Sequence, residues 1–483
     1  MSETDGKSRQ DFDTSSEVAG SEQAGATDGR EPVLGFVVLW SSVDTRHLGA
    51  WLPVADGASS TVRVLGRGAP GDAAEGARVA VVLQRPDGDR LLPPFQSTSL
   101  SRAQLELSPR GLGSLLVKNQ GRLPLRKNGE LCEDVVVEPG DVLEIGRQLA
   151  LLCTVRAKRM EGIEPDPDHA FGEPDRYGFV GESPAAWRVR ARAAFAAPHS
   201  GHVLILGPSG TGKELIAQRL HALSGRKGNL VSRNAATLPP ELVDAELFGN
   251  RVGYPNPGMV DRPGLVGEAD RGTLFLDEFA DLPNGAQAHL LRVLDAGEYH
   301  RLGESTARCS SLRLIAATNR PESDLRPDML ARFDFRIEVP DLKARVEDMP
   351  FLAAHLLRQM TAEHAELASR SFTPNGIPRL STSLLSALAM APLPGNVREL
   401  RQVLWATLAE QPGDALEWPR VHRPSEMPED EPPHDELAPH ELQRVLDANN
   451  GSIEKSWRAA GLSSRHALAR LVKKHGLRIT RRG

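Results

Sequence analysis

The sequence predicts a multidomain fold: a β-sandwich, an α/β nucleotide-binding domain with a helical lid, and a helical C-terminal domain. The length of 483 residues allows about three domains of ordinary size. Short apolar runs, often alternating, fill the first third of the chain, and apolar strands alternate with helical periods in the middle. A basic helical pattern follows at the end.

Composition excludes several classes of protein. The chain has 58 Lys and Arg against 64 Asp and Glu, a net charge of −6, so it is no polycation built to coat nucleic acid. No run approaches the roughly 18 apolar residues of a membrane span. The three cysteines are too few and too scattered for a disulfide framework or a clustered zinc site. We therefore expect a cytoplasmic protein with no membrane partner.

The amino-terminal third predicts a disordered tail followed by an all-β domain. Residues 1–33 are rich in Ser, Gly, Asp and Glu and cannot bury enough apolar surface to offset the entropy of ordering. Residues 34–156 carry four- to six-residue apolar runs bounded by turn residues, which is typical of a β-sandwich. The expected strands lie at residues 36–40, 61–65, 78–83, 104–107, 115–117 and 142–145.

The remaining chain predicts an α/β domain, a linker and a helical unit. Fully apolar strands at residues 203–206, 273–276 and 312–316 alternate with helical periods, which indicates a parallel sheet covered on both faces. This domain spans residues 178–411. Residues 412–439 collect Pro and acidic residues and predict an extended linker, and residues 440–483 predict short helices.

A glycine-rich loop, Gly-Pro-Ser-Gly-Thr-Gly-Lys at residues 207–213, joins an apolar strand to a helical pattern. Its backbone N–H groups, the helix N-terminus and the lysine can together hold phosphate oxygens. The strict P-loop has Ser or Thr after the lysine, where this chain has Glu, so a plain turn that packs a helix on a strand is the alternative. The predicted nucleotide contacts are Gly207, Ser209, Gly210, Thr211, Gly212, Lys213 and Glu214.

Two carboxylates, Asp277 and Glu278, end the next apolar strand. One can hold Mg²⁺ and the other can orient and polarise an attacking water molecule, although acidic residues also occur at solvated strand ends. A third strand ends at residues 318–319 in Thr-Asn. This combination of strands, loop and acidic pair predicts binding of ATP or GTP.

Residues 178–411 resemble the AAA+ domain of sigma-54-dependent transcriptional activators, the bacterial enhancer-binding proteins. The family's Glu after the P-loop lysine matches Glu214. The other matching stretches are Val-Gly-Glu-Ser at 180–183, Glu-Leu-Phe-Gly at 246–249, Gly-Thr-Leu-Phe-Leu-Asp-Glu-Phe at 272–279, Ala-Thr-Asn at 317–319 and Gly-Asn-Val-Arg-Glu-Leu at 395–400.

The resemblance implies roles for the pocket residues. Lys213 would bind the β- and γ-phosphates of ATP, Asp277 would serve Mg²⁺, and Glu278 would activate water. Asn234 has the position of the Asn that restrains this Glu, and Asn319 that of the first sensor.

The resemblance also implies an assembly. Arg398 matches the second sensor, which reaches the nucleotide from the lid. Arg326 and Arg332 match the arginine fingers that complete a neighbouring subunit's site, so activity would require a ring, expected to be a hexamer. Without the motif, both arginines would be read as surface residues.

The chain departs from the family in the loop that grips sigma-54. The family reads Gly-Ala-Phe-Thr-Gly-Ala, whereas residues 253–258 read Gly-Tyr-Pro-Asn-Pro-Gly. Two prolines stiffen a loop and remove N–H donors, and the Phe-Thr pair is absent. Tyr254 offers a substitute aromatic contact, or the loop is a plain turn without a partner. Engagement of sigma-54 RNA polymerase is therefore an open question.

The all-β segment resembles a forkhead-associated (FHA) domain through Leu-Gly-Arg-Gly at 65–68, Ser-Leu-Ser-Arg-Ala-Gln at 99–104 and Val-Lys-Asn-Gln-Gly at 117–121. That fold reads phosphothreonine, because a guanidinium and a hydroxyl together match a dianionic phosphate. Arg67 and Ser101 are the expected phosphopeptide contacts, with Arg102 and Asn119 beside them. Gln104 stands where the family commonly has His. A sandwich that serves only as an interaction module is the alternative.

The C-terminal segment predicts a helix-turn-helix and resembles the Fis-type domain of the same activators. From residue 463 onward it has no Asp or Glu. Its last helix can lie in the major groove of DNA, although a basic helix that only solvates a small bundle is the alternative. The predicted DNA contacts are Ser464, Arg465, His466, Arg470, Lys473 and Lys474.

Two functions follow from these units. The first is an ATP-hydrolysing transcription regulator in which the β domain receives a phosphorylation signal, the ring moves a loop, and the C-terminal domain binds DNA upstream of a promoter. The second is a DNA-binding switch or repressor in which nucleotide sets only the assembly state and no polymerase is remodelled.

Overall fold

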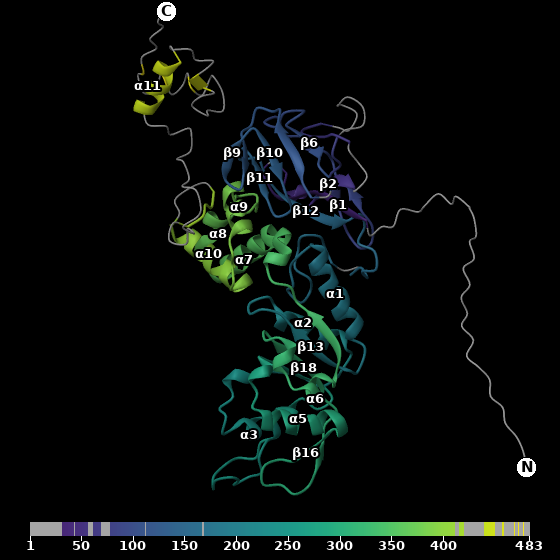
Figure 1. The fold of residues 1–483 in the computed structure, drawn as a ribbon. Helices are drawn as coiled ribbons and strands as arrows, with labels where there is room; N and C mark the ends of the chain where they lie inside the picture. The colour runs from purple at the N-terminus through teal and green to yellow at the C-terminus, as the bar shows by residue number, and fades with distance from the viewer. Residues whose placement is uncertain are drawn as a thin grey trace, which may run out of the picture.

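Three packed regions follow one another through the molecule in the computed structural model (Figure 1). The antiparallel strands of the first third of the chain lie at one end, and the lid helices lie against them. The parallel sheet with its helices extends toward the other end. The structure describes residues 31–42, 44–56, 61–68, 78–111, 113–166, 169–410, 415–419 and 439–449, together with residues 456, 457, 468, 472 and 477.

Two antiparallel sheets form the β domain. Their strand orders are β5-β4-β2-β1-β12-β11-β8-β9 and β10-β7-β6-β3. The strands are β1 (Pro32–Ser41), β2 (Trp51–Asp56), β3 (Arg63–Leu65), β4 (Val82–Leu83), β5 (Arg90–Leu91), β6 (Leu105–Pro109), β7 (Leu115–Asn119), β8 (Leu125–Lys127), β9 (Glu130–Cys132), β10 (Asp134–Val137), β11 (Val142–Ile145) and β12 (Leu149–Ala157). A short 3-10 helix, η1 (Thr45–His47), lies between β1 and β2.

Strand β1 is buried on both faces, and its side chains divide between two cores. Leu34, Phe36 and Val38 join side chains of the smaller sheet, such as Leu107, in one apolar cluster. Leu39 belongs to a different cluster, to which the lid helices contribute most of the side chains. The larger sheet therefore packs on the smaller sheet with one face and on the lid with the other.

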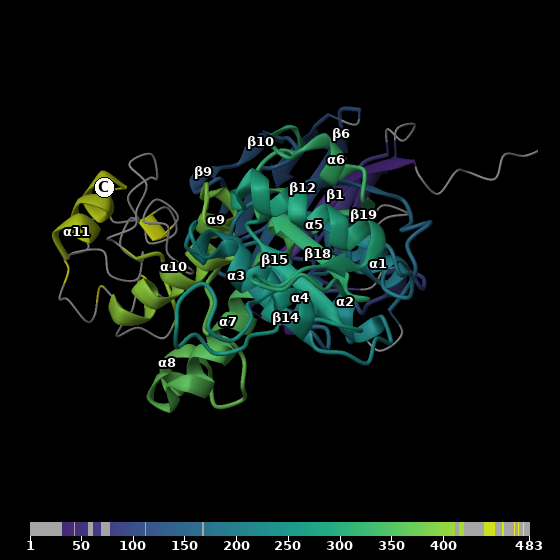
Figure 2. The ribbon, with the colours of Figure 1, turned by 90° about the horizontal axis from the view of Figure 1, so that it is seen from below.

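The α/β domain has a five-stranded parallel sheet in the order β14-β15-β18-β13-β19. Figure 2 views these strands from below, with the helices around them. The strands are β13 (His202–Leu206), β14 (Leu230–Asn234), β15 (Thr273–Asp277), β18 (Arg313–Thr318) and β19 (Phe333–Glu338). The helices are α1 (Pro184–Ala196), α2 (Lys213–Leu223), α3 (Val243–Phe248), α4 (Gly264–Glu268), α5 (Asn284–Ala296) and α6 (Pro327–Leu330), with the 3-10 turns η3 (Ala235–Thr237), η4 (Phe279–Asp281) and η5 (Glu322–Asp324).

The central strands of this sheet alternate between two cores. Leu204 of β13 lies with Leu290 of α5 in the cluster on one face. Val203 and Ile205 lie with Ile216 of α2 in the cluster on the other face. Because both faces are covered, these strands consist of continuous apolar runs. The carboxyl ends of the parallel strands meet at one edge of the sheet.

The lid follows the last strand. It comprises η6 (Lys343–Asp348), α7 (Met349–Glu363), η7 (Ala365–Leu367), α8 (Ala368–Ser371), α9 (Thr382–Met390) and α10 (Asn396–Glu410). A small hairpin of β16 (Glu298–Tyr299) and β17 (Arg308–Cys309) lies far from the lid, near α3 in Figure 1. Helix α11 (Pro439–Ala448) follows after the residues 420–438 that the structure does not describe.

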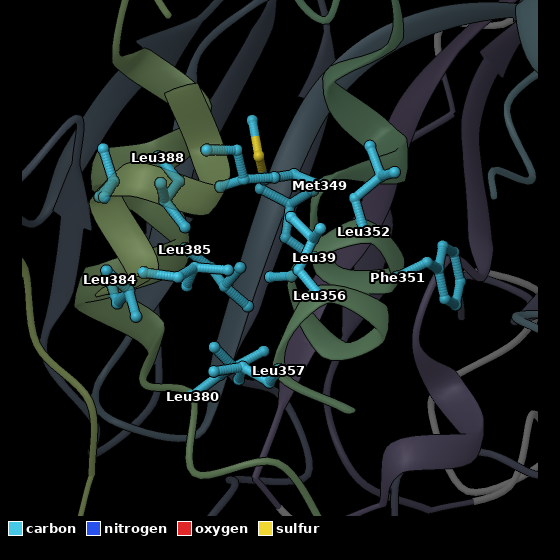
Figure 3. Close-up of a cluster of buried hydrophobic side chains, with 14 of the residues drawn as sticks. Leu39, Met349, Phe351, Leu352, Leu356, Leu357, Leu380, Leu384, Leu385 and Leu388 are labelled. Atoms are coloured by element: carbon cyan, nitrogen blue, oxygen red, sulfur yellow. The ribbon is translucent and has the colours of Figure 1, made fainter. Parts of the chain in front are cut away.

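The lid and the β domain share one hydrophobic core (Figure 3). Leucines of α7 and α9, including Leu356 and Leu385, surround Leu39 of β1. Trp40 of β1 and Leu152 of β12 belong to the same cluster. The lid and the β domain therefore pack directly against each other through this cluster.

The predicted all-β and α/β regions are present. Each of the six strands predicted in the β domain overlaps an observed strand, and the three apolar strands of the α/β domain are β13, β15 and β18. Strands β14 and β19 were not predicted, and in the β domain neither were the long strands β2 and β12 nor the short strands β5, β8, β9 and β10. The FHA likeness and the domain limits remain predictions.

Three predicted segments fall largely outside the described residues. These are the tail at residues 1–33, the linker at residues 412–439 and most of the helix-turn-helix at residues 440–483. Among the helices in the described residues, none combines the length and the apolarity that a membrane crossing requires.

Candidate nucleotide-binding site

The loop between β13 and α2 depends on glycines with positive φ. Gly207 and Gly210 have φ angles of 151° and 76°, which residues with a Cβ rarely adopt. A Cβ on Gly207 would lie 2.4 Å from the carbonyl oxygen of Val339, and one on Gly210 would lie 2.4 Å from that of Gly395. The loop therefore needs glycine for its conformation and also because the backbone of Val339, just after β19, and of Gly395, in the lid, approaches it closely.

Lys213 is the first residue of helix α2 and lies beneath this loop. Its ammonium donates hydrogen bonds to the carbonyl oxygens of Gly207 at 2.9 Å and Pro208 at 3.2 Å. Only 6% of the residue is exposed. Burial lowers the pKa of Lys213, while the nearby charges of Asp277 and Glu278 act in the opposite direction. A cation held here can compensate the charge of a phosphate group bound by the loop.

Two carboxylates, Asp277 and Glu278, lie at the carboxyl end of strand β15. In the sheet, β18 lies between β15 and β13. Glu278 has left-handed backbone angles, φ 49° and ψ 44°, which cost about 1–2 kcal/mol for a residue with a side chain. Its N–H donates to Oδ1 of Asp277 at 3.0 Å. The side-chain amide of Asn319, just beyond β18, donates to Oε1 of Glu278 at 3.4 Å. The sequence predicted all three positions, and the sheet brings them together.

Asn234 takes a different contact from the one expected. It ends β14 opposite Asp277 in the register of the sheet. Its Oδ1 accepts a hydrogen bond from the N–H of Ala236 at 2.9 Å and so caps η3. In the described residues the side-chain amide that bonds to Glu278 is that of Asn319. Restraint of Glu278 by Asn234 therefore remains a prediction that this conformation does not display.

The lid contacts the loop through the start of α10. Nη1 of Arg398 donates to Oγ of Ser209 at 3.2 Å, as expected for a residue that reaches the pocket from the lid. The buried amide of Asn396 donates to the carbonyl oxygen of Ser209 at 3.0 Å and accepts from the N–H of Leu342 at 2.7 Å. The N–H of Val397 donates to the carbonyl oxygen of Gly210 at 3.1 Å.

Sequence reasoning did not identify Asn396. Its φ of 53° lies in the left-handed region, where Asn is the residue other than Gly that fits most readily. The signal in the sequence was the Gly-Asn pair at residues 395–396 ahead of a helical pattern, which marks a turn but not the contact with the P-loop.

The residues present suit Mg²⁺ bound together with a nucleotide. No cluster of three or more His, Cys, Asp or Glu that could hold a metal occurs in the described part of the chain. Mg²⁺ bound to ATP needs only one or two carboxylates, because phosphate oxygens and water supply the other ligands. Asp277, at the strand end with Glu278 beside it, offers this donor set. Bound Mg²⁺ would supply positive charge to the phosphates.

Comparison with known proteins agrees with this geometry. The family description "Sigma-54 interaction domain" matches residues 179–342, and "AAA+ ATPase lid domain" matches residues 343–437. The transcriptional regulatory protein ZraR of Escherichia coli K12 is 34% identical over 311 residues, which cover 61% of this chain and 68% of ZraR. The chain belongs to the family of transcriptional regulators with a sigma-54 interaction domain.

Other similar proteins match only part of this chain. The formate hydrogenlyase transcriptional activator FhlA of E. coli K12 is 36% identical over 258 residues, which cover 52% of the chain but only 35% of FhlA. A solved structure of NtrX from Brucella abortus in complex with ATP is 30% identical, with a TM-score of 0.44, and the match covers 62% of this chain and 69% of NtrX.

Both arginines predicted to act as fingers pair with aspartates of the regulator's own chain. The guanidinium of Arg326 bonds to the carboxylate of Asp328, with Nε to Oδ1 at 3.0 Å, and this pairing raises the pKa of Arg326. Nε of Arg332 lies 2.6 Å from Oδ1 of Asp295. Both side chains are partly exposed. Neither bonds to the P-loop of its own chain in the described structure, so a role in the pocket would have to come from a neighbouring subunit.

The loop predicted to stand in place of the family's sigma-54 contact is a closed turn with an exposed tip. At its base, the buried amide of Asn250 donates to the carbonyl oxygen of Val260 at 2.9 Å. At its tip, the N–H of Gly253 donates to the carbonyl oxygen of Met259 at 2.8 Å. The ring of Tyr254 lies over Gly303 of the β16–β17 hairpin, where a Cβ would be 2.6 Å from Cγ of the tyrosine, yet 44% of Tyr254 is exposed.

The predicted phosphopeptide residues converge on one set of loops in the β domain. The N–H of Arg67 donates to the carbonyl oxygen of Ser101 at 3.0 Å, and the N–H of Arg122 donates to Oγ of Ser101 at 3.1 Å. Arg102 is exposed beside them. Arg122 was not predicted, because its position at the end of a neighbouring loop becomes clear only in the fold.

Gln104 holds these loops together. It is fully buried, and its Oε1 accepts a hydrogen bond from the N–H of Ser101 at 3.3 Å. Its Nε2 donates to Oδ1 of Asn119 at 2.8 Å. Gln104 therefore supports the loops that carry the predicted phosphopeptide residues. Asn119 accepts this bond from Gln104 and donates one to the carbonyl oxygen of Leu123. Its side chain therefore holds the loops together.

The predicted DNA contacts lie outside the described residues. These are Ser464, Arg465, His466, Arg470, Lys473 and Lys474. The described helix α11 lies just before this segment, and its Leu442 and Leu446 are buried.

Proposed function

We propose that this regulator binds and hydrolyses ATP with Mg²⁺ and uses the reaction to control transcription from DNA that its C-terminal segment binds. The observation that carries the proposal is the arrangement of five side chains at the edge of the parallel sheet. Lys213 lies under the P-loop beside the charges of Asp277 and Glu278, Asn319 bonds to Glu278, and Arg398 reaches the loop from the lid.

The chemistry of each group follows from its position. The loop N–H groups and Lys213 would neutralise the β- and γ-phosphates, and Asp277 would hold Mg²⁺. Glu278 would orient the attacking water and accept its proton. Asn319 would orient Glu278 through the hydrogen bond already present. Arg398 would contact the nucleotide from the lid, so that the lid senses whether the pocket is filled.

The proposed active form is a homo-oligomeric ring, expected to be a hexamer. Arg326 and Arg332 are held by aspartates on the surface of the α/β domain. An arginine supplied by a neighbouring subunit can accelerate phosphoryl transfer by about 10³–10⁵. In a ring, exchange of the aspartate for a neighbour's γ-phosphate would complete the site.

The proposed target is sigma-54 RNA polymerase, contacted through the loop around Tyr254. The family assignment supports this target, and the exposed ring of Tyr254 offers an aromatic contact in place of the family's Phe. The second candidate function is a nucleotide-switched DNA-binding regulator or repressor. The closed turn from Gly253 to Met259 favours it, because a loop fixed by its own hydrogen bonds is less able to swing during a reaction cycle.

We further propose that the β domain reads a phosphothreonine-containing protein. The backbone N–H of Arg122 bonds to the hydroxyl of Ser101, that of Arg67 bonds to the Ser101 carbonyl oxygen, and Arg102 is the next residue in the chain. A guanidinium together with a hydroxyl matches a dianionic phosphate. A phosphothreonine peptide should bind wild type and lose at least about tenfold in affinity in Arg67→Ala. Arg90→Ala, a surface arginine of the same domain, is the control. Equal binding by all three proteins would leave the domain as an interaction module.

The decisive experiment reconstitutes a promoter with purified sigma-54 polymerase. Wild type with ATP should stimulate open-complex formation, and Glu278→Gln should not. ATP hydrolysis with no stimulation, and no retention of sigma-54 with any nucleotide analogue, would support the second candidate. Absence of hydrolysis by the assembled wild-type protein would refute the first function, and absence of nucleotide binding would refute both.

A further inference from the structure

One short segment, η6, contacts both the β domain and the P-loop. It follows the last strand of the parallel sheet and is the first element of the lid. Three of its charged side chains point to different parts of the molecule: Arg345 to the P-loop, Glu347 to the β domain and Asp348 to the start of helix α1. One segment of six residues therefore links the P-loop, the β domain and the start of helix α1.

The contact with the β domain is a bidentate ion pair. Nε of Arg156, on the last strand β12, donates to Oε1 of Glu347 at 3.3 Å, and Nη2 donates to Oε2. The Arg156 and Glu347 side chains are only 3% and 12% exposed. The guanidinium also lies over the ring of Trp51, 5.4 Å from its centre. Removing one partner of such a pair leaves a buried charge without its counter-ion.

The contact with the pocket is made by Arg345. Its Nη2 donates to the carbonyl oxygen of Thr211, in the middle of the P-loop, at 2.9 Å. Its guanidinium stacks over Phe179 at 5.0 Å, and the residue is almost completely buried. A carbonyl held on this side leaves the loop N–H groups free to point the other way. Arg345 therefore supports the observed conformation of the P-loop from this side.

The third contact anchors the segment to the α/β domain. The buried carboxylate of Asp348 accepts hydrogen bonds from the N–H groups of Glu182 and Ser183, at 2.6 and 2.7 Å, and from the Ser183 hydroxyl at 2.7 Å. Ser183 in turn caps helix α1. The segment is thus held at three points within six residues, 343–348.

The apolar core reinforces the ion pair. Leu39 and Leu152 of the β domain share a core with Leu356 and Leu385 of the lid. The domains approach so closely that a Cβ on Gly49 would lie 2.5 Å from the ring of Phe351. The β domain is therefore fixed to the lid, whose helix α10 also touches the P-loop.

We propose that the β domain braces the nucleotide pocket, with Arg156, Glu347 and Arg345 acting as positioning residues that hold the P-loop in its binding conformation. This inference rests on the proposed ATPase function. A partner bound to the β domain would then act on nucleotide affinity through the shared core and η6, without touching the pocket.

The test compares full-length Arg156→Gln, Glu347→Gln and the double variant with wild type. The matched control is Lys118→Gln, which removes an ion pair with Glu106 on the smaller sheet. We expect KM for ATP to rise about tenfold in each interface variant while kcat stays within about twofold, and the double variant to resemble the single ones. Amides of residues 207–213 should exchange with deuterium faster in these variants and not in the control.

Several outcomes overturn the proposal. The proposal is refuted if folded Arg156→Gln has the KM of wild type and the same amide exchange at residues 207–213. It is also refuted if kcat rises, because the contact would then restrain hydrolysis. If Arg156→Gln fails to fold, Arg156→Lys keeps the charge but loses the bidentate geometry and should give an intermediate KM. Should wild type hydrolyse no ATP, the proposed function fails, yet the exchange measurement still tests the coupling.

Discussion

The side-chain amide of Asn319 donates a hydrogen bond of 3.4 Å to the carboxylate of Glu278 and joins the ends of two adjacent strands. Glu278 follows β15 and Asn319 follows β18, which pair in parallel through the sheet. The amide fixes one carboxylate oxygen and leaves the other for a water molecule. The orientation of the proposed general base thus depends on a residue of a different strand.

Replacement of these two residues should separate chemistry from binding. Glu278→Gln should lower kcat for ATP hydrolysis by about 10²–10⁴ and leave ATP binding within a few-fold, because the amide cannot accept a proton. Asn319→Ala should lower kcat by a smaller factor. Steady-state hydrolysis and equilibrium ATP binding are the measurements.

Glu322→Gln is the control for these variants. Glu322 lies between β18 and α6, and its carboxylate pairs with Arg336 at the surface. The kcat of this variant should equal that of wild type. Substantial hydrolysis by Glu278→Gln would assign the base to another group.

Asn396 should matter for both stability and nucleotide binding. It is buried at the start of α10, holds the carbonyl of Ser209 and has a φ of 53°. Asn396→Gly keeps the backbone conformation but loses the side-chain bonds, and should lower the free energy of unfolding by about 1–3 kcal/mol. Asn396→Ala should cost about 1 kcal/mol more, because a Cβ disfavours this φ.

Urea unfolding measures the difference between the two variants of Asn396. KM for ATP should rise in both, since each loses the lid's hold on the P-loop. Gln402→Ala, an exposed position on the same helix, should change neither quantity. Equal stability of the Gly and Ala variants would contradict the backbone argument.

How well the sequence predicts the strands of the α/β domain depends on where each strand lies in the parallel sheet. Strands β13, β15 and β18 are central and covered on both faces, so their apolar runs are obvious. The two missed strands, β14 and β19, are at the edges of the sheet. Their exposed polar residues, such as Arg233 and Asp334, interrupt the pattern that marks a buried strand.

The candidate site divides in a similar way. Motifs located Lys213, Asp277 and Glu278, because the chemistry of phosphate binding demands these residue types at fixed points. Neither Asn396 nor the pair of Arg156 with Glu347 has such a signature. Their partners lie far away along the chain, and only the packing of the β domain on the lid brings Arg156 and Glu347 together.

Lys213 should reduce the stability of the nucleotide-free protein. Burial lowers its pKa below the ordinary value, so the charged form is less favourable in the folded chain than in the unfolded one. This cost is fully present below the folded pKa and disappears as pH rises through it toward the unfolded value. Lys213→Met should therefore raise the free energy of unfolding at pH 7 by about 0.5–2 kcal/mol while abolishing ATP binding.

The pH dependence distinguishes this explanation from simple repacking. The stability difference between Lys213→Met and wild type should shrink as the pH rises through the lowered pKa of Lys213 toward the ordinary lysine pKa. Urea unfolding without nucleotide at several pH values is the measurement. A difference that does not change with pH would attribute the effect to packing of the methionine.

Mixing two inactive proteins tests whether Arg332 acts on a neighbouring subunit. Lys213→Ala has a defective pocket but keeps its arginines, whereas Arg332→Ala keeps its pocket but lacks the arginine. If Arg332 completes the neighbour's site, some interfaces of a mixed ring combine an intact pocket with an intact arginine. In an equal random mixture these are about a quarter of the interfaces, so hydrolysis should reappear on mixing.

The control for the mixing experiment pairs Lys213→Ala with Glu278→Gln. Both proteins then lack a working pocket while both keep Arg332, so no interface can be restored and the mixture should stay inactive. Recovery in the first mixture but not in the second requires an arginine supplied by the neighbour. If Arg332 instead only stabilises its own chain through Asp295, the first mixture also stays inactive, and Asp295→Asn lowers stability as much as Arg332→Ala.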